Sequence, residues 1–292
     1  MSEPAPDSAT AHFGDAGMRR FVMADAERRS LLPEVVRQVE EIGVPLQVAR
    51  YFTAAEPYDG LRLGLFAGHQ RIAVPQEETA GWLRVGFDGP LQMCVRPDGA
   101  LQGVFLGIGE PAVFVSSSVN AFNQSLTALD RSLGVIAAAA DLPSAAVAFR
   151  ELNEELREID PVAFAGRENW WPRVLDDVRH TLNFPFSASF EYRDGTGRKH
   201  IATESTGPGR AHPEELVWQK LSAGGVEPAQ VLRVYCELQP CMMPGHYCAA
   251  WMQAAFPHAE FTHSFDYGTD ADSREQGMKE LITYAAQQAG RR

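Results

Sequence analysis

The chain has 292 residues, of which 45% are hydrophobic and 10% aromatic, so it can bury the cores of two globular domains. Its 26 basic residues stand against 38 acidic ones, and the net charge of −12 argues against a protein that grips duplex nucleic acid by its phosphates. Four cysteines are too few for a disulfide framework, and no apolar run reaches the length of a membrane span, which excludes membrane insertion.

The front of the chain predicts a tail and then an α+β domain. Residues 1–17 are small and polar without an apolar signal core, so we expect a disordered tail and a cytoplasmic location. The next segment, up to residue 52, has mostly helical spacing that Pro33 and Pro45 interrupt. Short apolar runs then predict strands at residues 60–66, 71–74, 83–88, 91–107 and 110–117, with a hairpin turn at "RPDG" and Cys94 in the strand core.

Helical spacing returns after these strands. Residues 119–140 predict a helix capped by Asn120 or by a serine before it, and residues 145–182 predict further helix split near "DPVAFAGRENWWPR". Trp170 and Trp171 are expected to anchor this segment in a core, with stacking on nucleobases as the alternative. We therefore place the α+β domain at residues 18–180.

Residues 181–292 predict a separate α/β domain. The pattern gives a hairpin at 184–205, a helix at 212–225, a strand at 229–241, a helix at 247–256, a strand at 259–268 and a helix at 273–290. This order implies a partly parallel sheet that helices cover. From Glu191 onward the net charge is only −3, which leaves −9 for the residues before it.

One set of residues in this second domain has the composition of a hydrolytic metal site. Such a site needs three protein ligands, an open position for water and a proton carrier nearby. "HPE" supplies His212 and Glu214 at a helix start, and "PCMMPGHYC" supplies Cys241 and Cys248 between a strand and the next helix. Helix starts meet at the carboxyl edge of parallel strands, so His212, Cys241 and Cys248 can converge there.

This pattern resembles the cytidine-deaminase-like superfamily, whose signature is H-x-E followed by P-C-x-x-C. The resemblance covers residues 184–292 and includes the order of the elements. It implies zinc as the cofactor, His212, Cys241 and Cys248 as its ligands, and Glu214 as the catalytic proton shuttle in the hydrolysis of cytosine to uracil.

The second cysteine departs from the signature, because six residues instead of two separate it from Cys241. His246 lies in this longer loop and stays open as a substitute ligand. The length of this loop and the sequence "ELQPC" are most similar to those of bacterial toxin deaminases that act on nucleic acid. Single-stranded DNA is the expected substrate, since flipping a base out of a duplex costs a few kcal/mol and the sequence lacks a basic face.

Residues beside the predicted ligands are candidates for substrate binding. Glu237, Gln239 and Pro240 end the strand before Cys241, and Tyr267 ends the next strand near the same edge. Tyr267 and its neighbour Phe265 either stack on a base or pack inside the domain, and both readings stay open. Cys236 alternates with Val234 and Leu238 on one strand face, which predicts a core position.

The front domain resembles the SUKH superfamily of bacterial immunity proteins. The resemblance is carried by "FVSSSVNAFNQSL", "FRELNEELREIDPVAF" and "NWWPRVL" together with the helix–sheet–helix plan. It implies binding to a protein partner, and the acidity of this part suggests that it restrains the deaminase. The sequence contains no phosphate loop and no nucleophile–histidine pair in this region.

Three alternatives remain open at this point. The first is an interaction or immunity protein with a closed, structural zinc site that recruits His246 or Cys236 as a fourth ligand. The second is an immunity protein with the deaminase fold as a decoy, which the intact Glu214 argues against. The third is a deaminase of RNA or of free nucleotides.

Overall fold

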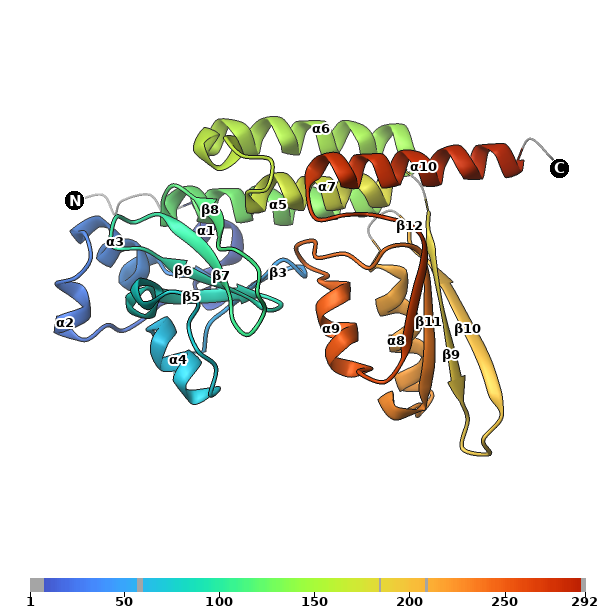
Figure 1. Cartoon of the computed structure of the whole chain (residues 1–292). Helices are drawn as coiled ribbons and strands as arrows, with labels where there is room; N and C mark the ends of the chain where they lie inside the picture. Colours follow the sequence, from blue (N-terminus) through green and yellow to red (C-terminus); the bar gives the residue numbers. More distant parts are fainter. Residues whose placement is uncertain (1–7, 57–59, 184, 208–209, 290–292) are drawn as a thin grey trace. The chain divides into compact units, whose positions relative to one another are not determined.

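The computed structural model describes residues 8–56, 60–183, 185–207 and 210–289, and the chain divides into two compact units. Unit 1 runs from Met1 to Leu175 and unit 2 from Asp176 to Arg292, so the division falls inside helix α7 (Trp170–Asn183). The predicted order, an α+β part followed by a layered α/β part, is confirmed (Figure 1).

A six-stranded antiparallel sheet forms the centre of unit 1. Its strands, in spatial and chain order, are β3 (Gln47–Val48), β4 (Phe52–Ala54), β5 (Leu83–Asp88), β6 (Leu91–Val95), β7 (Leu101–Phe105) and β8 (Val113–Ser116). The predicted "RPDG" turn joins β6 to β7, and Gly99 supplies the left-handed backbone, φ 90°, that this turn requires. Cys94 is fully buried in β6, as the strand pattern predicts.

Smaller elements precede and interrupt this sheet. They are α1 (Ser8–Phe13), η1 (Asp15–Gly17), β1 (Met18–Arg19), α2 (Asp25–Arg28), α3 (Pro33–Arg37), η2 (Gln38–Ile42), β2 (Val44–Pro45), α4 (Leu63–His69) and η4 (Glu77–Gly81). Strands β1 and β2 pair with each other as a separate two-stranded sheet. Pro33 starts α3 rather than ending a helix, because proline is tolerated at the first helical position.

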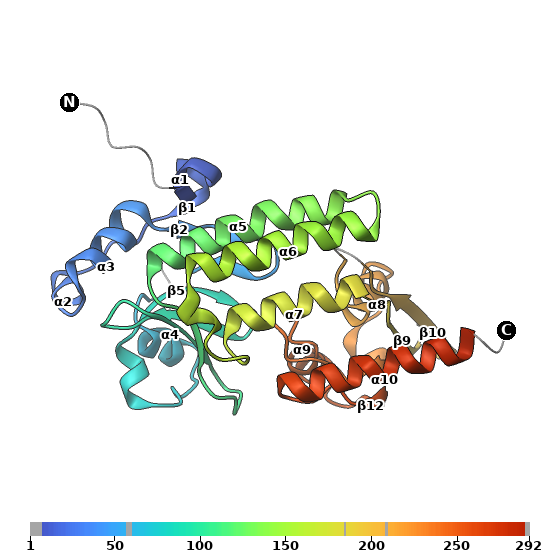
Figure 2. The same cartoon turned by 90° about the horizontal axis from the view of Figure 1, so that it is seen from above.

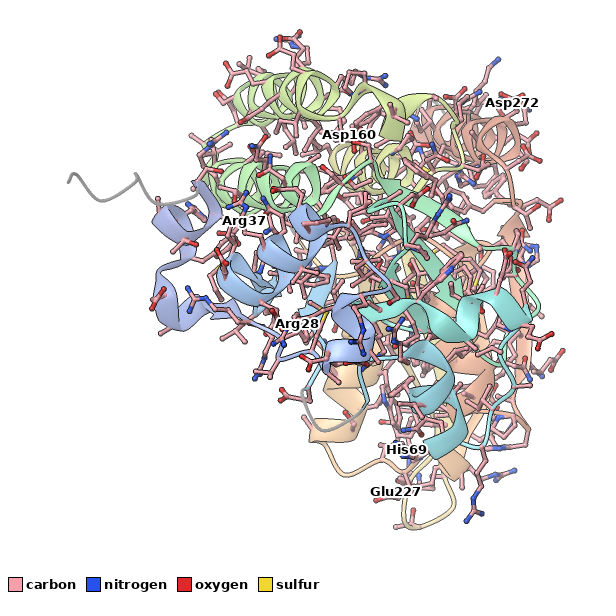
Figure 3. The ribbon with its side chains drawn as sticks, turned by 90° about the vertical axis from the view of Figure 1, so that its left-hand side faces the viewer. Arg28, Arg37, His69, Asp160, Glu227 and Asp272 are labelled. Atoms are coloured by element: carbon pink, nitrogen blue, oxygen red, sulfur yellow. The ribbon has the colours of Figure 1, made fainter. Side chains whose placement is uncertain are left out.

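Two long helices, α5 (Val119–Ala138) and α6 (Leu142–Ile159), lie side by side in unit 1 (Figure 2). The hydroxyl of Ser118 accepts a hydrogen bond from the backbone N–H of Ala121 at 3.1 Å, so a serine caps α5. Asp160, labelled in Figure 3, follows α6 and accepts hydrogen bonds at 2.7 Å from the side chain of Ser116 and the backbone of Ser117. These bonds tie the end of α6 and η5 (Pro161–Phe164) to β8.

The tryptophan pair at the start of α7 is part of the core of unit 1. Trp170 and Trp171 have no exposed surface, and their rings lie 6.2 and 6.5 Å from that of Phe122. The indole N–H of Trp170 donates to the buried carboxylate of Asp88 at 2.9 Å. The predicted anchoring role is confirmed, and neither ring offers a face for stacking on a base.

Three local predictions are wrong. Residues 8–17 are not a disordered tail, because α1 buries Ala9 against α5 and His12 pairs with Asp130 at 2.9 Å; residues 1–7 lie outside the described residues. The strand expected at residues 60–66 is helix α4, in which Leu63 and Ala67, one helical turn apart, are buried. Residues 71–74 contain no strand either.

A four-stranded sheet in the order β10-β9-β11-β12 forms the centre of unit 2. The strands are β9 (Ser187–Arg193), β10 (Lys199–Ser205), β11 (Val231–Leu238) and β12 (Glu260–Phe265). The helices are α8 (Pro213–Ala223), α9 (Cys248–Ala255) and α10 (Ala271–Ala289), with a short turn η6 (Pro228–Gln230) before β11. Helices α8 and α9 cover the same face of the sheet (Figure 1).

The topology of unit 2 brings the ends of several elements to one edge. Strand β11 pairs with β9 antiparallel and with β12 parallel, so β11 and β12 have their carboxyl ends at the same edge. The core beneath that edge includes Phe190, Val217, Cys236, Met252 and Leu281.

Within the described residues, no helix combines the length and the apolar character that crossing a bilayer requires.

Candidate metal centre

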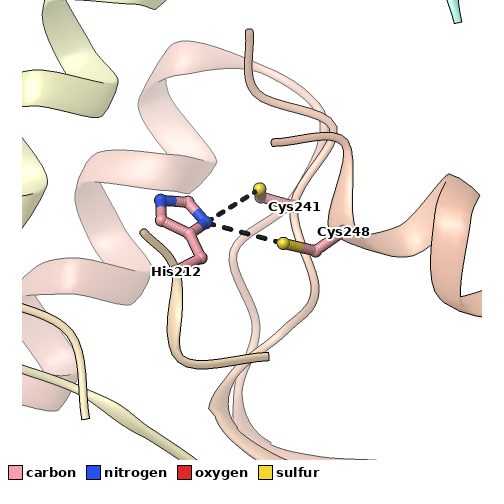
Figure 4. Close-up of side chains that lie close together, drawn as sticks. All are labelled: His212, Cys241 and Cys248. Carbon is pink, nitrogen blue, oxygen red and sulfur yellow. Dashed lines mark hydrogen bonds between the residues drawn. The ribbon is translucent and has the colours of Figure 1, made fainter. Parts of the chain in front are cut away.

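Three donor atoms converge at the carboxyl edge of the sheet in unit 2 (Figure 4). His212 is the residue before α8, Cys241 follows β11, and Cys248 is the first residue of α9. Nδ1 of His212 lies 3.5 Å from Sγ of Cys241 and 3.6 Å from Sγ of Cys248. All three side chains are buried, so these donors face one another rather than solvent. We call them the donor cluster.

The spacing of the donor cluster fits a tetrahedral zinc ion. Zinc–sulfur bonds of about 2.3 Å and zinc–nitrogen bonds of about 2.0 Å, at a tetrahedral angle, separate sulfur and nitrogen by about 3.5 Å. The two observed separations match this value. Two thiols and an imidazole supply three ligands and leave a fourth position, which is the arrangement of catalytic rather than closed structural zinc sites.

The loop between the cysteines, residues 242–247, folds back to bring Cys248 beside Cys241. The carbonyl of Met243 accepts hydrogen bonds from the backbone N–H groups of His246 and Tyr247 at 3.2 and 3.0 Å. Gly245 and Tyr247 have positive φ angles of 77° and 45°, which turn the chain sharply into α9. The N–H of Ala249 then donates to the carbonyl of Cys241 at 3.0 Å and fixes the start of α9 next to β11.

The charges of the donor cluster are set by burial and by mutual contacts. Burial opposes ionisation of Cys241, yet hydrogen bonding by Cys248 and the charge of His212 hold the pKa of its thiol well below the usual value. Burial also opposes protonation of His212, but Cys241 and Asp177 raise its pKa well above the usual value. Burial raises the pKa of Cys248. These contacts favour a thiolate at Cys241 beside a positive charge, and a metal cation can supply that charge.

Glu214 lies against the donor cluster at the start of α8. Its side chain is buried, and Oε2 lies 3.8 Å from Sγ of Cys248. Burial raises the pKa of this carboxyl group, while a hydrogen bond from the thiol of Cys236 acts in the opposite direction. Glu214 supplies no donor atom to the cluster, so its carboxyl group is available to carry protons beside it.

A second group of side chains contacts His212 on the Nε2 side of its ring. Nε2 of His212 lies 3.1 Å from Oδ1 of Asp177, and Nε2 of His246 lies 3.2 Å from Oδ2 of the same carboxylate. Nδ1 of His246 lies 2.6 Å from Oε2 of Glu215, which also accepts the backbone N–H of His212 at 2.9 Å. We call Asp177, His212, His246 and Glu215 the carboxylate–histidine network.

The geometry of this network distinguishes it from a metal site. Asp177, His212 and His246 place donor atoms within 4.8 Å of one another. However, the two imidazole rings are stacked with centroids 3.6 Å apart and an interplanar angle of 3°, so no single ion can lie in both ring planes. Both nitrogens of His246 face carboxylate oxygens, which leaves this ring no lone pair for a metal. The donor cluster is the better metal centre.

A small pocket opens beside the donor cluster. It has a cavity volume of about 10 Å³ and is lined by His180, Phe186, His212, Glu214, Leu238, Gln239, Cys241 and Tyr267. This volume holds about one water molecule. The hydroxyl of Tyr267 lies 2.5 Å from Nδ1 of His180, and burial together with Arg179 lowers the pKa of His180 to about 3. Because the guanidinium of Arg179 can only donate to Nε2 of His180, at 3.4 Å, the neutral ring carries its proton on Nδ1 and donates it to the hydroxyl oxygen of Tyr267.

The other predicted substrate-binding residues are divided between this pocket and its surroundings. Gln239 lines the pocket, and its side-chain oxygen accepts the backbone N–H groups of Tyr267 and Gly268 at 3.0 and 3.1 Å. Pro240 stands between this residue and Cys241, outside the lining. Glu237 also lies outside it and accepts the N–H of Ser187 at 2.6 Å. The ring of Phe265 lies 5.6 Å from that of Tyr284.

Sequence reasoning missed Asp177, His180 and Glu215. Asp177 and His180 are three residues apart on α7, so both face the same side of the helix. That spacing is the only sequence signal, and it is common in helices. Cys236 has the expected core position, but its contact with Glu214 was not expected.

Two family models match the chain. The SUKH-4 immunity protein model matches residues 5–177, and the Xanthomonas-like deaminase model matches residues 185–284. Both resemblances noted in the sequence are confirmed by these matches, in the same order along the chain. No curated protein and no solved structure matches the chain.

Proposed function

Because the chain belongs to the SUKH-4 immunity protein family and carries a deaminase-like domain after that match, we propose that it is a zinc-dependent deaminase of cytosine in nucleic acid. One observation supports this proposal above the others. The imidazole of His212 and the thiols of Cys241 and Cys248 have the spacing of zinc ligands, and a buried carboxyl group, that of Glu214, lies beside them.

The proposed chemistry is a hydrolysis in which water replaces the amino group at C4 of cytosine. Zinc, when bound by the donor cluster, supplies a Lewis acid that lowers the pKa of water toward about 7. Glu214 takes the proton from the attacking water and delivers it to ring nitrogen N3. Glu214 then carries the proton of the new C4 hydroxyl to the amino group, which leaves as ammonia, and the product is uracil. Burial keeps the Glu214 carboxyl away from competing bulk water while it moves the proton.

Single-stranded DNA is the proposed substrate. A base must leave its stack to reach a buried site, and this costs least when the strand is already unpaired. Proteins that bind a duplex use a long basic surface, and the net charge of −3 from Glu191 onward argues against such a surface. RNA and free nucleotides share the reacting ring, so they are the competing substrates for a direct comparison.

The full-length chain, loaded with zinc, provides the direct test. It is to be incubated with labelled single-stranded DNA, duplex DNA, RNA and cytidine, and uracil or uridine is to be measured for each. We expect product from single-stranded DNA at the highest rate. Product from RNA or cytidine alone would identify that molecule, instead of single-stranded DNA, as the substrate. Bound zinc without any product would favour a structural metal site.

Tyr267 is proposed to stack on the substrate base once the pocket opens. Its ring lines the pocket, which is too small for a base while the hydroxyl is bonded to His180. Because base–aromatic stacking contributes about 1–3 kcal/mol, Tyr267→Ala is expected to lower kcat/KM by about 10- to 100-fold. Tyr267→Phe keeps the ring and should stay within a few-fold of the native chain. Equal losses in the two variants, measured on single-stranded DNA, would contradict a stacking role.

Unit 1 is proposed to bind a protein partner and to restrain the deaminase. Residues 1–190, most of which belong to unit 1, carry a net charge of −9, which has the same sign as that of a nucleic acid and supports restraint. The same assay on a fragment of residues 175–292, which retains Asp177, is expected to give faster deamination; an unchanged rate would contradict restraint.

The four free thiols suit a reducing cytoplasm, where thiolates stay available to metal.

A further inference from the structure

The carboxylate of Asp177 lies between two imidazoles that serve different purposes. One of its oxygens lies 3.1 Å from Nε2 of His212 and the other 3.2 Å from Nε2 of His246. Its side chain is 2% exposed, so its charge faces these two imidazoles rather than water. Moving the proton of His212 to Nδ1 would leave a buried carboxylate facing a lone pair.

This contact determines which nitrogen of His212 faces the cysteines. A proton on Nε2 faces the negative charge of Asp177, and the lone pair of the ring is then on Nδ1. Nδ1 is the atom that lies 3.5 and 3.6 Å from the two sulfurs. Asp177 thus selects the tautomer of His212 that can bind a metal at the donor cluster.

His246 holds the plane of the His212 ring. The rings are parallel within 3° with centroids 3.6 Å apart, so His212 cannot rotate without displacing His246. Glu215 fixes the other nitrogen of His246 and the backbone of His212, which closes the network around both rings. His246 comes from the loop of six residues between the cysteines, so the extra length of that loop supplies this support.

We propose that Asp177 and His246 are positioning residues that fix the tautomer and the plane of His212 for metal binding. Asp177 lies on α7 outside residues 185–284, so the metal centre depends on a residue that the deaminase match does not contain. This inference rests on the proposed function, because it requires that the donor cluster binds zinc.

The test measures metal affinity in the full-length chain by competition with a chelator, with Asp177→Asn and His246→Asn beside the native protein. Loss of an outer partner of a metal-bound histidine costs about 10- to 100-fold in affinity, and we expect this loss in both variants. The absorption spectrum of the Co²⁺-loaded protein should also shift, because the His212 ring changes its orientation. Asp266→Asn is the matched control, since Asp266 pairs with His263 at 2.9 Å on the surface.

A purely structural role gives a different result. It would lower the unfolding free energy of metal-free and metal-loaded protein equally, leave the affinity and the Co²⁺ spectrum unchanged, and overturn the proposal. Nitrogen-15 NMR of the native, zinc-loaded chain covers the case in which the variants fail to fold. It should show His212 protonated at Nε2 and bound to metal through Nδ1, and the opposite tautomer would overturn the proposal. If the native chain binds no zinc, the proposed function fails as well.

Discussion

Replacing Glu214 with glutamine is expected to lower the rate of cytosine deamination by about 10²- to 10⁴-fold while zinc remains bound. Glutamine has nearly the same shape but cannot take a proton from water and pass it to the ring nitrogen. Glu214 provides no donor atom to the cluster, so the metal content of the variant should equal that of the native chain.

Two measurements on the same sample make this prediction specific. Metal content is determined by elemental analysis, and uracil formation is measured on single-stranded DNA. Glu204→Gln is a suitable control, because Glu204 is a carboxylate of unit 2 that pairs with Lys220 at 2.6 Å on the surface. A Glu214→Gln variant with native activity would remove the proton shuttle from the proposed mechanism. A variant without zinc would instead show that Glu214 helps to hold the metal.

The element order of unit 2 could be predicted from sequence because each element has its own periodicity. Strands β9 and β10 alternate around a clear turn, and each later helix is separated from the next strand by glycine or proline. In unit 1 the segment of residues 60–66 misled the prediction, because its leucines and glycines alternate like a strand. The buried pair Leu63 and Ala67 has helical spacing, which only the packing of α4 reveals.

The donor cluster and its support differ in how visible they are in the sequence. His212, Glu214 and Cys241 occur in short patterns because each is tied to the end of one element. The carboxylate–histidine network joins α7 to a loop 69 residues later through the pair Asp177 and His246, and no local spacing encodes such a contact. His246 is conspicuous in the loop, but its contacts with two carboxylates favour the proposed supporting role over that of a ligand.

Replacing either Cys241 or Cys248 with serine is expected to remove zinc and to abolish deamination. Each thiol is one of only three donors in the cluster, and a serine hydroxyl is a poor ligand for zinc compared with a thiolate. Because zinc binding stabilises the folded state, both variants should also lose the rise in the melting temperature of unit 2 that zinc gives the native chain.

The other two cysteines provide controls, because they are the same residue type at positions outside the donor cluster. Cys94 is buried in unit 1, and Cys94→Ala should leave metal content and activity unchanged. Cys236 is buried in unit 2, and Cys236→Ala should retain zinc while losing about 1–2 kcal/mol of unfolding free energy through poorer packing. Since its thiol contacts Glu214, metal content rather than rate is the informative measurement there. Loss of zinc from Cys236→Ala, or its retention in Cys248→Ser, would point to a closed structural site, because the ligand set would then differ from the donor cluster.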